Sequence, residues 1–143
     1  MSALEILVKL IRDSEGCELK SYKCPAGIWT IGYGQTKGVK EGMVWTQQQA
    51  DEDLLETAWE VLNQALNASS VLKKATSQRQ AAIADFIYNL GIGNYNSSTL
   101  KKYVDKENWA SAYTEIKKWN KAGGKVLKGL TIRREREASL LLA

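Results

Sequence analysis

The sequence has one strand-like block between segments with helical periodicity, and this limits the folds open to the chain. Residues 17–42 hold the only proline, Pro25, within the turn signal Pro25-Ala26-Gly27. Aromatic and β-branched side chains lie on both sides of this turn, in Leu19–Lys23 and Ile28–Gly34. Such a pattern predicts a β-hairpin. We therefore expect an α+β fold in which helices dominate.

Apolar residues recur at helical spacing in the rest of the chain. Ser2 and Glu5, like Thr46 and Gln49, have the spacing of a capping box and predict two helix starts. Gly91 follows a third periodic segment and is a normal residue for a helix end. We expect four main helices and two shorter ones, at about 2–11, 46–66, 77–90, 130–142, 98–104 and 108–119.

The composition narrows the chemistry. The 143 residues, 44% of them hydrophobic, suit one ordinary domain with its own core. There is no histidine, which excludes Ser-His and Cys-His catalysis, and two cysteines cannot supply four zinc ligands. An enzyme of this composition that moves protons near neutral pH must rely on carboxyl groups. We expect neither a metal nor a cofactor.

Charge, cysteines and hydropathy give weaker indications. The net charge of +4 suits a polyanionic partner such as nucleic acid, an anionic membrane face or bacterial cell wall. Cys17 and Cys24 are not spaced as a C-x-x-C motif, and we expect two unpaired thiols, although a hairpin could bring them opposite each other. We see no signal peptide and no membrane span, and expect a protein made in the cytosol.

Three residues around the hairpin are candidates for chemistry. Glu15 lies where the first helix gives way to the hairpin, but a single glutamate is more often a surface residue. Thr30 is an ordinary strand residue, yet Gly32 and Gly34 follow it on the same face. Glycines in a strand often mark the close approach of a ligand or another backbone, so this face resembles a cleft wall. Cys24 ends the first strand, where a buried inert thiol is the default.

Residues 133–137 alternate basic and acidic side chains. Such a run usually forms a solvated face crossed by salt bridges. One of its arginines could instead turn inward and hold a carboxylate.

Glu15, Cys24 and Thr30, separated by eight and then five residues, resemble the catalytic pattern of the phage-type lysozymes, or endolysins. The similarity continues in order along essentially the whole chain. It includes Trp29–Gly34, Asn89-Leu90-Gly91, Ser98-Thr99-Leu100, Trp119, Ala122-Gly123-Gly124, Gly129-Leu130 and Arg133-Arg134-Glu135.

The resemblance implies a muramidase that hydrolyses the β-1,4 bond between N-acetylmuramic acid and N-acetylglucosamine in peptidoglycan. It implies a two-lobed domain over 1–143. A hairpin lobe would span about 14–45 and a connecting helix 46–66, while 67–143 and the N-terminal helix would form a helical lobe. We expect a monomer that acts on the bacterial cell wall after release, with glycan strands as partners and neither nucleic acid binding nor membrane insertion.

Site roles also follow from the resemblance. Glu15 is the expected general acid, and partial burial would help it keep its proton. Arg133 or Arg134 is the expected neighbour, whose charge opposes that protonation. Thr30 would hold the attacking water. Cys24 stands where aspartate is commoner, and it could act as a thiolate base, an electrostatic stabiliser or a covalent nucleophile.

Two other functions remain open at this stage. The missing aspartate allows a peptidoglycan-binding module without turnover. The basic, leucine-containing segment 133–142 allows a cationic membrane-active protein, although Leu140 and Leu141 more plausibly pack into the core.

Overall fold

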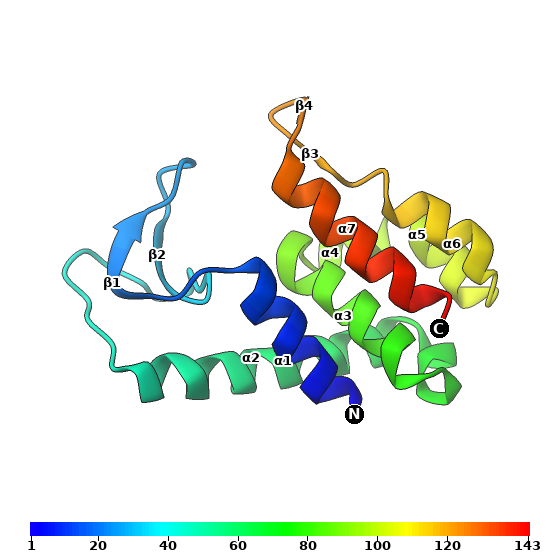
Figure 1. The fold of residues 1–143 in the computed structure, drawn as a ribbon, viewed down its shortest axis with the longest axis horizontal. Helices are drawn as coiled ribbons and strands as arrows, with labels where there is room; N and C mark the ends of the chain where they lie inside the picture. Colours follow the sequence, from blue (N-terminus) through cyan, green and yellow to red (C-terminus); the bar gives the residue numbers. More distant parts are fainter.

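A computed structural model describes residues 1–143 and divides them into a small hairpin region and a larger group of helices (Figure 1). Helix α2 runs beneath both parts, and the hairpin region stands apart from the helices in the same view. The elements in chain order are α1 Ala3–Ser14, β1 Glu18–Lys23, β2 Trp29–Gly32, α2 Gln47–Ala68, the 3₁₀ helix η1 Ser70–Lys74, α3 Ser77–Leu90, α4 Ile92–Asn96, α5 Thr99–Asp105, α6 Trp109–Ile116, β3 Lys121–Ala122, β4 Lys125–Val126 and α7 Lys128–Leu141.

The predicted β-hairpin is confirmed. Strands β1 and β2 are antiparallel, and Tyr22 pairs with Thr30. Thr30 and Ile31 point to opposite faces of β2, yet both are buried. The strand is covered on both sides, one of them through Gly32, whose missing Cβ would lie 2.8 Å from the Trp45 ring. Thus a side chain of the protein occupies part of the space that the sequence suggested for a ligand.

Both predicted capping boxes are present. The Ser2 hydroxyl accepts a hydrogen bond from the Glu5 backbone while the Glu5 carboxylate accepts one from Ser2, and Thr46 and Gln49 repeat this exchange at the start of α2. These bonds satisfy backbone donors that the first turn of a helix leaves free. They fix the start of α1, whose other end carries Glu15. They also fix the start of α2, which underlies both parts of the molecule.

Other helix limits differ by a few residues from the expected ones. Helix α3 uses Thr76 as its N-cap, since the hydroxyl accepts the Arg79 backbone N–H, and it ends at Gly91 as predicted. Helix α7 begins at Lys128, two residues before the expected start, and α6 ends at Ile116, three residues before the expected end. Three short elements, η1, α4 and the β3–β4 hairpin, were not predicted, because a single turn or a two-residue strand carries no periodicity.

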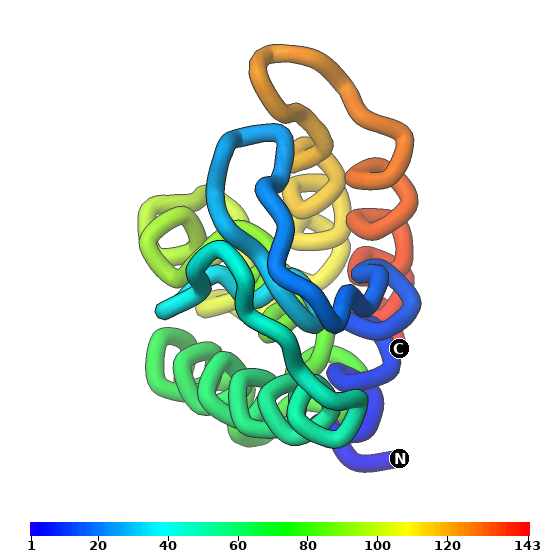
Figure 2. The backbone as a smooth tube through the Cα atoms, turned by 90° about the vertical axis from the view of Figure 1, so that its left-hand side faces the viewer, coloured from blue at the N-terminus to red at the C-terminus, as the bar shows by residue number.

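Helix α3 forms the centre of the helical part. It packs against α1, α2 and α7, and all residues from Ala81 to Ile87 are buried. Figure 2 shows the helices gathered around it and the β1–β2 hairpin projecting from them. One member of this buried run, Asp85, is a carboxylate. A charge in this position requires partners, since an unpaired ion in a protein interior is strongly unfavourable.

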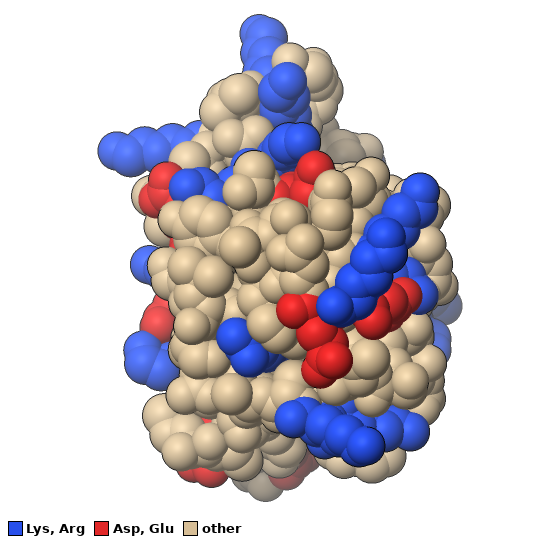
Figure 3. Space-filling model, turned by 90° about the vertical axis from the view of Figure 1, so that its right-hand side faces the viewer, with Lys and Arg blue, Asp and Glu red and all other residues tan.

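The surface carries its basic and acidic side chains interspersed over the face shown in Figure 3, with lysine and arginine projecting at the top, where the β3–β4 hairpin lies in Figure 1. Each helix is too short or too polar to span a lipid bilayer.

Candidate active site

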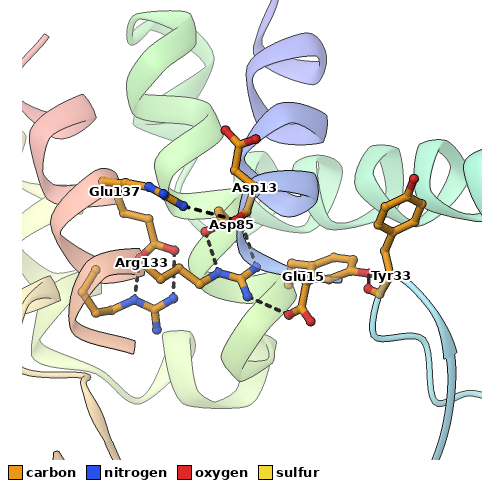
Figure 4. Close-up of polar contacts among 9 residues, drawn as sticks. Asp13, Glu15, Tyr33, Asp85, Arg133 and Glu137 are labelled. Carbon is orange, nitrogen blue, oxygen red and sulfur yellow. Dashed lines mark hydrogen bonds and ion pairs between the residues drawn. The ribbon is translucent and has the colours of Figure 1, made fainter. Parts of the chain in front are cut away.

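Glu15 is the C-terminal cap of α1. Its backbone N–H donates to the Ile11 carbonyl at 2.7 Å, and the chain then turns into β1. The side chain is 27% exposed and accepts a hydrogen bond at 2.7 Å from Arg133 Nη1 (Figure 4). The carboxyl group therefore lies at the junction of the hairpin and the helices, partly open to solvent and held by one strong donor.

Gly34 allows the Glu15 carboxyl to take this position. A Cβ at residue 34 would lie 2.8 Å from Glu15 Oε2, closer than real Cβ contacts allow. The residue also has φ +80°, a conformation that favours glycine. The close approach suggested by the strand glycines is real, but at Gly34 the approaching group is the candidate acid.

Arg133 joins Glu15 to the interior. Its Nε and Nη2 donate to Asp85 Oδ2 and Oδ1 at 3.0 and 2.9 Å, while Nη1 donates to Glu15. Burial alone would lower the pKa of Arg133, but the hydrogen bonds and charges of Asp85 and Glu15 outweigh it and raise the pKa. The guanidinium thus stays positive. Its planar set of N–H donors lets the two carboxyl partners bind it from different sides.

Arg134, the other candidate neighbour of Glu15, points elsewhere. Its Nη2 donates to Glu137 Oε2 at 2.9 Å, and its guanidinium lies 5.3 Å from the centre of the Phe86 ring. Both arginines are buried, so the solvated face expected for residues 133–137 is limited to Glu135 and Arg136. Core packing around α3 turns Arg133 and Arg134 inward, where they bind the carboxylates of Asp85 and Glu137.

Asp85 and Glu137 were not singled out in the sequence. Burial would raise the pKa of Asp85, but hydrogen bonds from Glu137 and Arg133 keep it low, so Asp85 is ionised. Burial raises the pKa of Glu137 well above its ordinary value, and the Asp85 charge adds to this effect, while the charges of Arg134 and Arg133 oppose it. A usable signal existed for Asp85, because a lone carboxylate within an apolar helix stripe needs a buried partner.

Cys24 and Thr30 come together at the tip of the hairpin. The backbone of Cys24 donates to the Ile28 carbonyl at 2.9 Å, and Thr30 Oγ1 donates to that same carbonyl at 3.0 Å. Hydrogen bonding from the Ile28 backbone is the main cause that lowers the pKa of the Cys24 thiol, with the Thr30 side chain contributing. These hydrogen bonds ease ionisation of the Cys24 thiol, which lies next to the buried Thr30 hydroxyl.

Burial raises the pKa of the Tyr22 phenol, and the negative charges of Glu15, Glu18 and Cys24 add to this effect. A cavity of about 470 Å³ opens beside Glu15 and Arg133. Cys24 and Thr30 do not line it. The cavity walls come from α1, α3 and the start of α7, with Asn89, Leu127, Gly129 and Leu130 among them.

Cys17 takes no part in this arrangement. Both cysteines are free thiols, and Cys17 lies near Gln47 and Tyr33, on the side of α2.

Comparison with known proteins identifies the class to which this chain and its fold belong. Residues 12–137 match the phage lysozyme family. The endolysin of Acyrthosiphon pisum secondary endosymbiont phage 1 is 38% identical over 135 residues, which cover 92% of this chain and 91% of that protein. The endolysin from Escherichia coli O157:H7 phage FAHEc1 has the same fold, with a TM-score of 0.85 and 32% identity over 99% of this chain and 94% of that one.

The chain therefore belongs to the phage lysozyme family, and the resemblance noted in the sequence is confirmed. It is an endolysin homologue, a glycoside hydrolase that degrades peptidoglycan of the host cell wall, with the helix-dominated α+β fold of that family. Some relatives are longer. The endolysin of Bacillus phage B103 is 37% identical over 94% of this chain, and this chain spans about half of its length (52%).

Proposed function

We propose that the protein is a muramidase that hydrolyses the β-1,4 bond between N-acetylmuramic acid and N-acetylglucosamine, with Glu15 as the general acid. The observation that carries this proposal is the position of the Glu15 carboxyl, partly exposed beside a cavity and oriented by Arg133. Glycoside hydrolysis needs an acid at the leaving oxygen and a group that delivers water from the other face of the sugar.

The hairpin supplies the second group in this proposal. Thr30 is assigned to hold the attacking water, and the Cys24 thiolate to stabilise the positive charge that develops on the sugar or to take the proton from that water. The lowered pKa of the Cys24 thiol supports a charged role. Neither role needs a metal or a cofactor, and the substrate would lie between the hairpin and the helices.

The substrate bond is tested by the products released from purified peptidoglycan. A muramidase leaves muramic acid at the new reducing ends, which borohydride reduction and mass spectrometry identify. Glu15→Gln should abolish release, while Glu135→Gln, an exposed change on α7, should keep it. Reducing ends on glucosamine, or full activity in Glu15→Gln, would refute the proposal.

The charge at position 24 is tested separately. Cys24→Asp restores a negative group and should keep activity, whereas Cys24→Ser should lose most of it. Equal activity in both variants would exclude a requirement for charge. A protein that binds peptidoglycan without releasing reducing sugar would instead be the non-catalytic binding module.

A further inference from the structure

A general acid bonded to a buried arginine presents a conflict that the neighbouring residues resolve. Arg133 is 5% exposed and lies 2.7 Å from Glu15, so a buried positive charge directly faces the carboxyl group. The proposed reaction needs the protonated form at the moment when the leaving oxygen departs. Some other group must therefore reduce the pull of Arg133.

Asp85 has the geometry to do this. It is fully buried on α3 and takes two of the three donor positions that Arg133 uses, on the side of the guanidinium away from Glu15 (Figure 4). An ionised carboxylate at this distance cancels much of the arginine charge, and in a low-dielectric interior this effect is strong. The bidentate contact also fixes the guanidinium plane, which aims Nη1 at Glu15.

Glu137 completes the arrangement. It is fully buried, hydrogen-bonds to Asp85 and contacts Arg134. Two carboxyl groups share a hydrogen bond only when one of them is protonated, and the raised pKa of Glu137 indicates that it carries this proton. Glu137 thus occupies the far side of Asp85 without adding a charge, and it holds a proton that could be released if Asp85 were neutralised.

We propose that Asp85 is a positioning residue for hydrolysis, which offsets the charge of Arg133 and so allows Glu15 to keep the proton that the reaction consumes. This inference rests on the proposed role of Glu15 as general acid. Glu137 acts as a reserve, since its ionisation would replace a lost Asp85 charge. Other charged or titratable groups that face Glu15 or Arg133 come from every neighbouring element, namely Asp13, Tyr22, Tyr88, Arg134 and Arg136.

The test is the pH profile of peptidoglycan hydrolysis, measured as kcat/KM for wild type, Glu137→Gln and Asp85→Asn/Glu137→Gln. Glu137→Gln mimics the protonated residue and should leave the alkaline limb of the profile unchanged. In the double variant Arg133 keeps Glu15 as its only carboxylate partner, and Arg134 has none. The alkaline limb should then move to lower pH, by about one unit or more, because Glu15 ionises earlier. If the alkaline limb of the double variant coincides with that of Glu137→Gln, the inference is overturned.

A second series remains informative if that variant does not fold. Arg133→Gln removes the opposing charge, so the alkaline limb should move to higher pH. Adding Asp85→Asn/Glu137→Gln to Arg133→Gln leaves neutral groups at all three positions, and most of the shift seen in the double variant should vanish there. The same downward shift with and without Arg133 would show that Asp85 does not act through it. If Glu15→Gln keeps activity, the role of Glu15 fails; if Glu15→Gln is inactive and the limbs do not move, only the role of Asp85 fails.

Discussion

Arg133 Nη1 and Glu15 Oε1 lie 2.7 Å apart although 118 positions separate the two residues in the chain. The contact joins the end of α1 to the first half of α7, with α3 between them supplying Asp85. The candidate acid is therefore oriented by the same buried ion pair that helps to fasten three helices together. Changes in this cluster should affect both stability and activity.

The stability part is tested by Arg133→Met. This change leaves the fully buried Asp85 without its cation, and we expect a loss of about 3–5 kcal/mol in the free energy of unfolding. Urea unfolding followed by circular dichroism measures it. Arg136→Met, on the same helix but exposed, should cost less than about 0.5 kcal/mol. Similar losses in both variants would mean that the ion pair has no special weight.

Gly34→Ala should impair activity through Glu15. The new Cβ would lie 2.8 Å from Glu15 Oε2, so the carboxyl group must move, and kcat should fall by about tenfold or more. The strain of a positive φ adds about 1–2 kcal/mol of destabilisation. Gly38→Ala is a matched control, since φ is +71° there but nothing lies within 4 Å of the added Cβ. It should lose stability alone, and an equal loss of kcat in both variants would contradict the role of Gly34.

Glu137→Gln should change how stability depends on pH. The folded state holds the Glu137 proton to higher pH than the unfolded chain, so this residue lowers the stability of the wild type as the pH rises above about 4.3. Glutamine cannot ionise. The advantage of Glu137→Gln should be small below about pH 4 and grow toward neutral pH, by about 1.4 kcal/mol per unit of pKa shift. Thermal unfolding of both proteins across this pH range measures the difference in stability. A difference that does not vary with pH would be inconsistent with a protonated Glu137.

The Cys24 thiol should react with iodoacetamide at a lower pH than an ordinary cysteine. Its pKa is lowered chiefly by hydrogen bonding from the Ile28 backbone, so the midpoint of the rate against pH should fall below about 8.5. Cys17→Ser isolates the reaction at Cys24, and lytic activity should disappear in step with alkylation. An ordinary midpoint, or full activity after complete alkylation, would argue against a thiolate in the site.

Lysines of the β3–β4 hairpin, which leads into the cavity wall, should strengthen the attraction to the anionic cell wall. Lys121, Lys125 and Lys128 are exposed and form no salt bridge, and Leu127 and Gly129, on either side of Lys128, line the cavity. Replacing Lys121 and Lys125 with glutamine should raise KM at low salt by about threefold or more, with little change in kcat. The difference should shrink at high salt. The same change at Lys73 and Lys74, on η1, is the control, and an equal effect there would indicate net charge alone.

Local signals in the sequence predicted much of the fold. Capping boxes at Ser2 and Thr46, the glycine at the end of α3 and the turn at Pro25 act within a few residues, so they can be read without the tertiary structure. The weaker results lie where packing decides. Strand β2 is covered on both faces, which the alternation of its side chains along the sequence cannot show. The inward turn of Arg133 and Arg134 depends on α3, which lies about fifty residues away along the chain.

The sequence by itself determined the longer helices and the β1–β2 hairpin through periodicity and caps, and its motifs, Glu15, Cys24 and Thr30 among them, carried the resemblance to the family. Only the tertiary structure decided which arginine meets Glu15, and that Asp85 and Glu137 complete the cluster. The physical reason is that a buried charge is tolerated only beside its partners. Those partners come from helices that are distant in sequence, so their identity is settled by packing.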